Sequence, residues 1–361
     1  MAPFESSRSD RSAVSATAST MVEALIPIWQ RVLQRPSIGI EENFFDIGGN
    51  VTSADSLFAE IDRVCGRKVP TATIFQAPTI AALASMLELP SLPPFSPFVS
   101  LKAGEHPPIL ITHGLGGRAR FYELAKHILT GHSIYGIQAR GIDGREEPFD
   151  RIEDMAEFYL AALKDLQPEG PYVLIGYSFG GLVALEMAQR FTAEGKHIQL
   201  LVLVDAYPHP RQMSGRQRLR LGMQRTKRRI SQMSQQSFPD AIAYFVGGLK
   251  RRLGLAAGHA GNSHFPDASP LSLAQTTLQV KRKAYVALAR YRPRPYRGKI
   301  KFLKSESDEY FPGDPMPVWE HLVADFEVET VPGTHLDMVT AHFDSLAAVL
   351  TRYLHETFSQ E

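Results

Sequence analysis

The chain has 361 residues, with 44% hydrophobic residues, 21% charged residues and a formal net charge of +1 at pH 7. This composition is typical of a folded globular protein, and so balanced a charge excludes strong overall attraction to nucleic acids or membrane surfaces. The single cysteine, Cys65, excludes an internal disulfide and a cysteine-based zinc site; we expect no metal and a cytoplasmic protein.

The N-terminal region is predicted to form a small helical domain preceded by a tail. Residues 1–20 are rich in Ser and Ala and lack the apolar core of a signal peptide or membrane anchor, so we expect a disordered tail there. Apolar residues recur at helical spacing over residues 22–34, about 53–64 and 71–88. This spacing predicts an all-α, four-helix domain over residues 21–88.

Composition and periodicity both change after this domain. Residues 89–106 belong to a proline-dense stretch with little periodicity, which predicts an extended linker. Over residues 107–361, short apolar runs alternate with longer amphipathic stretches. The expected strands are 109–112, 133–138, 172–175, 200–204, 300–303 and 326–331, and the expected helices include 121–129, 152–166 and 180–191. This alternation predicts an α/β fold, with a parallel sheet covered by helices on both faces.

The segment Gly176-Tyr177-Ser178-Phe179-Gly180 follows one expected strand and opens the next expected helix. A serine that caps a helix after a glycine turn could produce the same five letters. In a strand–turn–helix context, however, the two glycines permit a tight turn that lifts the serine hydroxyl above the sheet. We therefore predict that Ser178 is a nucleophile.

A serine hydroxyl needs a base to remove its proton, and the base in turn needs a carboxylate that fixes its tautomer. In α/β-hydrolase chains the order is serine, acid, histidine. His335 follows the last expected strand and is the predicted base. Asp205, at the end of the strand after the serine, is the favoured acid, and Glu306 and Asp308 beyond a later strand are the alternatives.

An acyl-transfer site also needs backbone N–H groups that stabilise an oxyanion. The N–H of Phe179, directly after the serine, is one expected donor. The glycine-rich segment 113–117 follows the first expected strand, and we choose Leu115 within it as the second donor. Taken alone, this segment would be interpreted as an ordinary glycine turn.

Residues 207–285 lie between the predicted acid and a late strand, where we expect a helical lid. Residues 207–257 hold eleven Lys or Arg residues and a single acid, Asp240. A solvated helix face is the simplest interpretation of this basic run. A docking surface for an acidic carrier protein or an acidic acyl chain is the main alternative. A surface for membranes or nucleic acids has no supporting motif.

Together with residues 290–296 (Arg-Tyr-Arg-Pro-Arg-Pro-Tyr), these motifs resemble the thioesterase domains of nonribosomal peptide and polyketide synthases over residues 107–357. In that family the acid commonly follows the strand after the nucleophile, which matches Asp205. The resemblance implies transfer of an acyl group from a pantetheine thiol to Ser178, followed by release as an acid, lactone or lactam.

Residues 22–88 resemble a peptidyl or acyl carrier protein, whose motif F-F-x-x-G-G-x-S ends in the serine that holds phosphopantetheine. The matching segment here, residues 44–51, reads Phe-Phe-Asp-Ile-Gly-Gly-Asn-Val. Val51 occupies the serine position and has no hydroxyl, while Ser53 lies two positions too late. We expect phosphopantetheine to be absent from this chain, either because the domain has become a docking or stabilising module or because the residue was altered.

The sequence thus predicts a serine hydrolase that acts as a thioesterase in natural-product biosynthesis. We expect no cofactor in the α/β domain and an acyl or peptidyl substrate brought by another protein's carrier or by coenzyme A. The expected partners are a carrier protein or synthase in trans and a small acyl substrate, without nucleic acid or membrane. An acyltransferase or condensing enzyme with the same acyl-Ser178 is one alternative, as is a conventional esterase or lipase. A non-catalytic scaffold that binds carriers is an alternative of another class.

Overall fold

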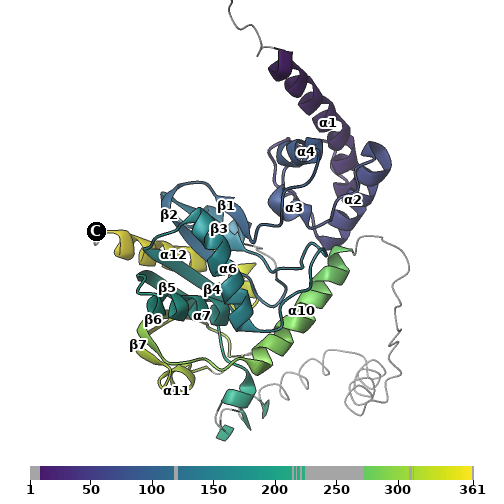
Figure 1. Ribbon diagram of the computed structural model, residues 1–361. Coiled ribbons are helices and arrows are strands. Elements are labelled where there is room, and N and C mark those ends of the chain that lie inside the picture. Colours follow the sequence, from purple (N-terminus) through teal and green to yellow (C-terminus); the bar gives the residue numbers. More distant parts are fainter. Residues whose placement is uncertain are drawn as a thin grey trace, which may run out of the picture.

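The computed structural model describes residues 9–117, 121–213, 272–308, 311 and 313–359, with short pieces between 215 and 223. Figure 1 shows two parts, which we call the helical domain (residues 9–88) and the sheet domain (residues 98–359). Most of the region expected to form a lid, including most of its basic run, lies outside the described residues.

The helical domain contains α1 (Ser9–Leu33), α2 (Val51–Cys65), α3 (Thr73–Gln76) and α4 (Ile80–Glu88). Apolar residues from all four helices and from the loop before α2 fill its core, because their spacing places them on the inner face of each helix. The fully or nearly fully buried members include Leu25, Trp29, Phe44, Leu57, Ile61, Ile74, Leu83 and Leu87. The predicted four-helix arrangement is therefore present.

The expected disordered tail is wrong over residues 9–20, because α1 already begins at Ser9. Figure 1 shows the first part of this helix extending beyond the other helices of the domain. Ala13, Ala16 and Ala18 have the highest helix propensity, and they extend a helix whose later turns are anchored in the core by residues such as Trp29. Residues 1–8 lie outside the described residues.

The sheet domain is built on a seven-stranded sheet in the order β1-β3-β2-β4-β5-β6-β7. The strands are β1 (Phe98–Lys102), β2 (Glu105–Thr112), β3 (His132–Ile137), β4 (Tyr172–Tyr177), β5 (Ile198–Val204), β6 (Tyr296–Ser305) and β7 (Val323–Val331). β1 pairs with β3 in the antiparallel sense, and the other neighbours are parallel. The predicted α/β architecture is confirmed.

The linker is shorter than the expected range of 89–106, because β1 and the start of β2 fall inside it. The segment 98–102 alternates buried and more exposed residues, as a strand with one covered face does. Prolines on both sides hide this short alternation in the sequence. The connection between the two domains is therefore confined to residues 89–97.

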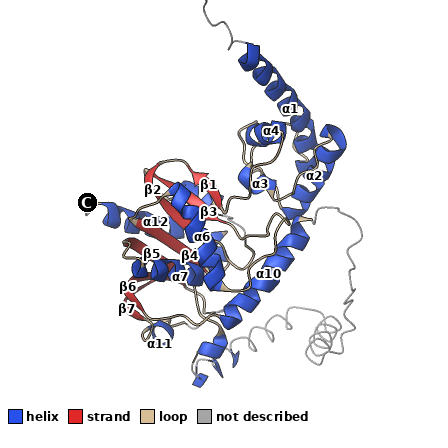
Figure 2. Cartoon of the chain, in the orientation of Figure 1, coloured by secondary structure: helices blue, strands red, loops and turns tan. Residues whose placement is uncertain are grey.

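Helices cover both faces of the sheet, as Figure 2 shows. One face packs against α5 (Tyr122–His127) and α12 (Phe343–Phe358), and the other packs against α6 (Ile152–Leu166), α7 (Phe179–Ala193) and α11 (Met316–Trp319). Successive residues of a strand point to opposite faces, so β4 serves both cores. α10 (Leu273–Arg290) contacts α6 of the sheet domain and α2 of the helical domain. Within the described residues, no helix is long and apolar enough to cross a membrane.

A buried carboxylate fixes α7 in the sheet domain. Glu186 is 2% exposed and accepts hydrogen bonds from Arg190 Nε (3.0 Å), Tyr291 Oη (3.0 Å) and Arg294 Nη2 (3.2 Å). A buried charge is tolerated when several donors satisfy it, and losing it leaves those donors unpaired. Glu186 therefore links the helix that follows the predicted nucleophile to the segment before β6.

We expect Glu186→Ala to lower the free energy of unfolding by about 2 kcal/mol, because the buried Tyr291 hydroxyl and the two guanidinium groups lose their shared acceptor. The matched control is Glu157→Ala. Glu157 also pairs with Arg190, at 3.3 Å, but its side chain is 74% exposed, so its loss should cost less than about 0.5 kcal/mol. Urea unfolding followed by circular dichroism measures both, and equal losses would contradict this account.

Candidate active site

Glycines permit the tight turn that carries Ser178. A Cβ on Gly176 would lie 2.4 Å from the Cα of Gly181, so no larger residue fits where β4 meets α7. Ser178 itself has φ 55° and ψ −123°, a conformation that residues other than glycine rarely adopt. Its backbone N–H donates to the carbonyl of Val204 (2.8 Å), which ties the turn to the end of β5.

The acid and the base predicted from the sequence are hydrogen-bonded to each other. His335 Nδ1 donates to Asp205 Oδ2 at 2.8 Å, and both side chains are buried, with Asp205 1% exposed. The carboxylate holds the proton on Nδ1, so Nε2 becomes the nitrogen that can accept one. Asp205 directly follows β5 and has a positive φ of 48°, the second strained position at this edge of the sheet.

Two further groups, not predicted from the sequence, hold this pair in place. Ser305, at the end of β6, donates to the Asp205 carboxylate from its hydroxyl (2.9 Å) and its backbone N–H (3.3 Å). Tyr177 donates from its hydroxyl to the backbone carbonyl of His335 (2.7 Å), and its ring stacks on the imidazole with centroids 5.0 Å apart. Since Tyr177 precedes Ser178, the serine and the imidazole are held at the same edge of the sheet.

The alternative acids lie in a different environment. Glu306 and Asp308 are exposed, and Asp308 pairs with Lys304 at 3.8 Å. An exposed carboxylate is screened by water and cannot orient an imidazole as a buried one does. The geometry therefore favours Asp205.

The segment 113–117 packs directly against the turn that carries Ser178. A Cβ on Gly180 would lie 2.3 Å from the carbonyl oxygen of His113, and Thr112 Oγ1 donates to the Gly180 carbonyl at 2.6 Å. Phe179 is the first residue of α7, where backbone N–H groups have no partner within the helix. Both predicted donor segments thus adjoin the predicted nucleophile.

A buried histidine fixes one peptide unit of this segment. His113 is 1% exposed; its Nδ1 contacts the carbonyl oxygen of Gly114 (2.7 Å), and its Nε2 contacts the hydroxyl of Tyr159 (2.9 Å). A carbonyl can only accept, so Nδ1 carries the proton and Tyr159 donates to Nε2. In a trans peptide the N–H points opposite to the C=O. Holding the Gly114 carbonyl therefore fixes the direction of the Leu115 N–H.

Burial lowers the pKa of His113 from 6.5 to about 4, because the cation would lose its hydration. A depressed folded-state pKa gives stability that is complete above about pH 6.5 and is lost as the pH falls toward 4, because the unfolded chain binds the proton first. We expect this residue to lower the free energy of unfolding by up to about 3 kcal/mol across that interval. The measurement is urea unfolding at a series of pH values.

The control for this prediction is a difference between variants. His113→Gln should weaken the pH dependence of stability between pH 6.5 and 4 relative to wild type, because glutamine binds no proton in this range. Equal slopes for wild type and His113→Gln would show that His113 titrates as it does in water.

In the helical domain, Val51 is the first residue of α2. Asn50 caps this helix by accepting from the backbone N–H groups of Thr52 (3.0 Å) and Ser53 (3.1 Å). The hydroxyl of Ser53 accepts in return from the Asn50 N–H (2.8 Å), which completes a capping box. Ser53 is thus a structural residue of the helix start. Because it comes two residues after Val51, it lies on a different side of α2 from the attachment position.

Known protein families match both parts of the chain. Residues 107–354 match the family described as thioesterase domain, and residues 23–87 match the phosphopantetheine attachment site. Over 190 residues the chain is 38% identical to a dimodular nonribosomal peptide synthase of Bacillus subtilis (strain 168), and over 180 residues it is 37% identical to an indigoidine synthase of Streptomyces lavendulae. These alignments cover 52% and 49% of this chain but only 8% and 14% of the two relatives.

Solved structures share the fold. A holo four-domain nonribosomal peptide synthetase bound to AMP and glycine matches 99% of this chain and 27% of its own length, with a TM-score of 0.55 and 21% identity. The NocB thioesterase domain, in covalent complex with a fluorophosphonate nocardicin G analogue, matches 71% of this chain and 99% of its own length, with a TM-score of 0.50 and 23% identity.

Proposed function

The chain belongs to the thioesterase domain family, and from this premise we propose that it cleaves an acyl or peptidyl thioester through a covalent acyl-Ser178 intermediate. The observation that carries the proposal is the buried hydrogen bond between His335 and Asp205. With the proton held on Nδ1, the nitrogen that would act as the base is Nε2, on the side of the ring opposite the carboxylate.

In the first half of the proposed reaction, His335 Nε2 accepts the proton of the Ser178 hydroxyl as the oxygen attacks the thioester carbonyl. Negative charge develops on the carbonyl oxygen, and the N–H groups of Leu115 and Phe179 stabilise it. The tetrahedral intermediate then expels the thiol, which takes the proton from His335. The acyl group remains on Ser178 as an ester.

In the second half, an acceptor attacks this ester while His335 removes the acceptor's proton, and the imidazolium then gives that proton to the Ser178 oxygen as the acyl–oxygen bond breaks. Water would release an acid, and a hydroxyl or amine within the acyl chain would release a lactone or lactam. Asp205 stays ionised throughout and stabilises the imidazolium, and Ser305 supports that carboxylate by its two hydrogen bonds. No cofactor takes part in these steps.

The substrate is proposed to arrive on another protein's carrier or on coenzyme A. Val51 has no hydroxyl to which phosphopantetheine could be attached, and the hydroxyl of Ser53 serves the helix cap. A carrier protein or a larger synthase acting in trans is therefore the proposed partner. Nonribosomal peptide and polyketide synthesis are the proposed biosynthetic context.

We expect Ser178→Ala to abolish thiol release from an acyl-pantetheine thioester, because the variant lacks the hydroxyl that would form the acyl ester. Asp205→Asn should lower kcat by about 10⁴, because the amide favours the wrong imidazole tautomer. Thiol release is followed with a chromogenic disulfide reagent on the full chain.

The matched control is Asp308→Asn, which makes the same chemical change at an exposed carboxylate beyond β6. It should keep nearly the wild-type rate. A silent Asp205→Asn combined with an impaired Asp308→Asn would show that the wrong acid has been assigned, and undiminished turnover in Ser178→Ala would remove the proposed nucleophile.

A further inference from the structure

The loop that carries the carrier-type motif rests on α5 of the sheet domain. The ring of Phe45 stacks on that of Tyr122, with centroids 6.2 Å apart and planes 17° apart. The Tyr122 hydroxyl donates to the backbone carbonyl of Phe75 (2.9 Å), and Lys126 forms an ion pair with Asp46. The first contact surface between the domains therefore combines an aromatic pair, of which Tyr122 is buried and Phe45 partly buried, with opposite charges at its edge.

A second contact joins α2 to α10. The Asp55 carboxylate accepts a hydrogen bond from the backbone N–H of Leu273 (2.8 Å), the first residue of α10. A carboxylate at a helix N-terminus is stabilised by the free N–H groups and by the helix dipole. Val51 lies four residues before Asp55, so the two share one face of α2, the face that looks toward α10.

The two helices that the helical domain contacts, α5 and α10, also lie next to the candidate site. Phe121, next to α5, packs edge-on against Tyr177 with ring centroids 6.1 Å apart, and Tyr177 in turn stacks on His335. Val280 of α10 lies so close to Gly117 that a Cβ on the glycine would be 2.4 Å from its Cγ1. The contact between the two domains therefore lies next to the predicted nucleophile, Ser178, and the predicted oxyanion segment, residues 113–117.

From these contacts we propose that the surface formed by α5 and the start of α10 is the docking site for acyl-loaded carrier domains; this proposal rests on the proposed function. The helical domain of this chain, which cannot be loaded, occupies that site. The partner is a helical carrier that keeps the attachment serine and presents carboxylates where Asp46 and Asp55 lie. Access in trans then requires the helical domain to leave.

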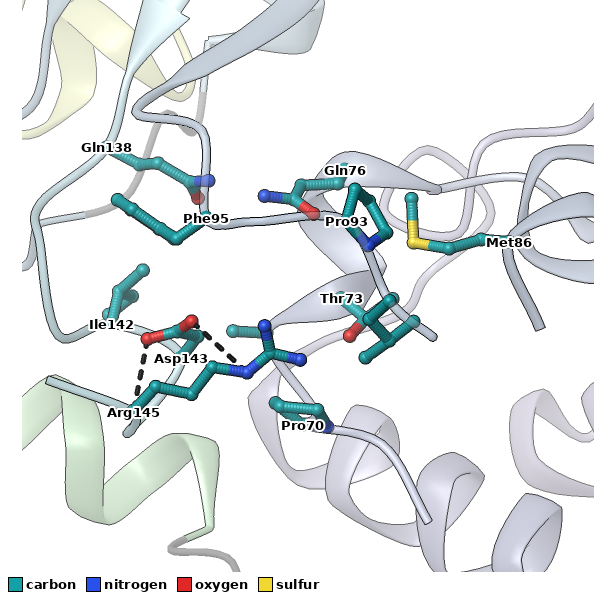
Figure 3. Close-up of a pocket in the computed structure, with 12 residues that line it drawn as sticks. Pro70, Thr73, Gln76, Met86, Pro93, Phe95, Gln138, Ile142, Asp143 and Arg145 are labelled. Carbon is teal, nitrogen blue, oxygen red and sulfur yellow. Dashed lines mark hydrogen bonds and ion pairs between the residues drawn. The ribbon is translucent and has the colours of Figure 1, made fainter. Parts of the chain in front are cut away.

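The contact between the two domains leaves a small pocket. Figure 3 shows a pocket between the domains, where the Asp143–Arg145 ion pair and residues from α3, α4 and the linker face one another without close packing. Phe95 packs on Ile142 and Val280 of the sheet domain, so residues 89–94 form the part of the linker that would let the helical domain leave. Fully extended, this stretch spans about 20 Å, which keeps the released domain nearby and at a high effective concentration.

The test uses one substitution in two settings. Val51→Ser restores the attachment hydroxyl, and a phosphopantetheinyl transferase with octanoyl-coenzyme A then loads the chain, as checked by intact mass. In cis, we measure the rate at which the loaded Val51→Ser chain loses its octanoyl group. In trans, the loaded Val51→Ser/Ser178→Ala chain serves as donor for a separate, unloaded acceptor chain.

Asp55→Lys places a cation at the positive end of α10 and weakens docking of the helical domain that carries it. In cis, it should slow octanoyl loss by about tenfold, the effect of losing one charge-assisted hydrogen bond. In the trans acceptor, it should speed octanoyl loss, because the docking surface becomes vacant. The control Asp62→Lys makes the same change at an exposed position of α2 and should alter neither rate.

The same direction of change in both settings, or no change in either, would overturn the docking proposal. Free octanoyl-pantetheine thioester separates this failure from that of the proposed function, because it needs no docking. Its turnover should be equal in wild type and in the control Asp62→Lys, and it should be lost in Ser178→Ala. Absence of that turnover in wild type would overturn the proposed function itself.

Discussion

The hydrogen bond between His335 and Asp205 depends on several strand ends meeting at one edge of the sheet. Asp205 directly follows β5, and Ser305, which holds the carboxylate, ends the neighbouring strand β6. His335 lies in the loop after β7. β4, on the other side of β5, delivers Ser178. Parallel strands carry their carboxyl ends to the same edge, so residues far apart in the chain become neighbours there. The backbone strain at Ser178 and Asp205 occurs at this edge, where the surrounding sheet holds both residues in place.

Ser178, Asp205 and His335 could be predicted because each has a local signal: a glycine turn, a polar residue after an apolar strand, and a histidine late in the chain. Ser305 and the His113–Tyr159 pair have no such signal, because their partners are set by tertiary packing across 100 and 46 positions of the chain. β1 was hidden by flanking prolines, and the first turns of α1 by a composition that suits both tails and helices.

The helical domain keeps the shape of a carrier while its attachment position holds Val51. Its core is complete, its second helix is capped by Asn50, and its motif loop lies against α5 through Phe45. Phe44, Phe45 and Asn50 of the motif thus contribute to folding and to the contact between domains. The position that would carry phosphopantetheine holds Val51 instead of serine. In the docking proposal, such a domain acts by occupying the carrier-docking surface, and the charges at its edge set how tightly it binds there.

Mass spectrometry of the intact protein is the sharpest test of the proposed acyl ester on Ser178. The full chain is mixed with a panel of acyl-pantetheine thioesters, quenched in acid and weighed, and the modified peptide is then sequenced. We expect an added acyl mass on the peptide that contains Ser178, present in wild type and absent in Ser178→Ala. An adduct that persists in Ser178→Ala, or one that maps to another residue, would contradict it.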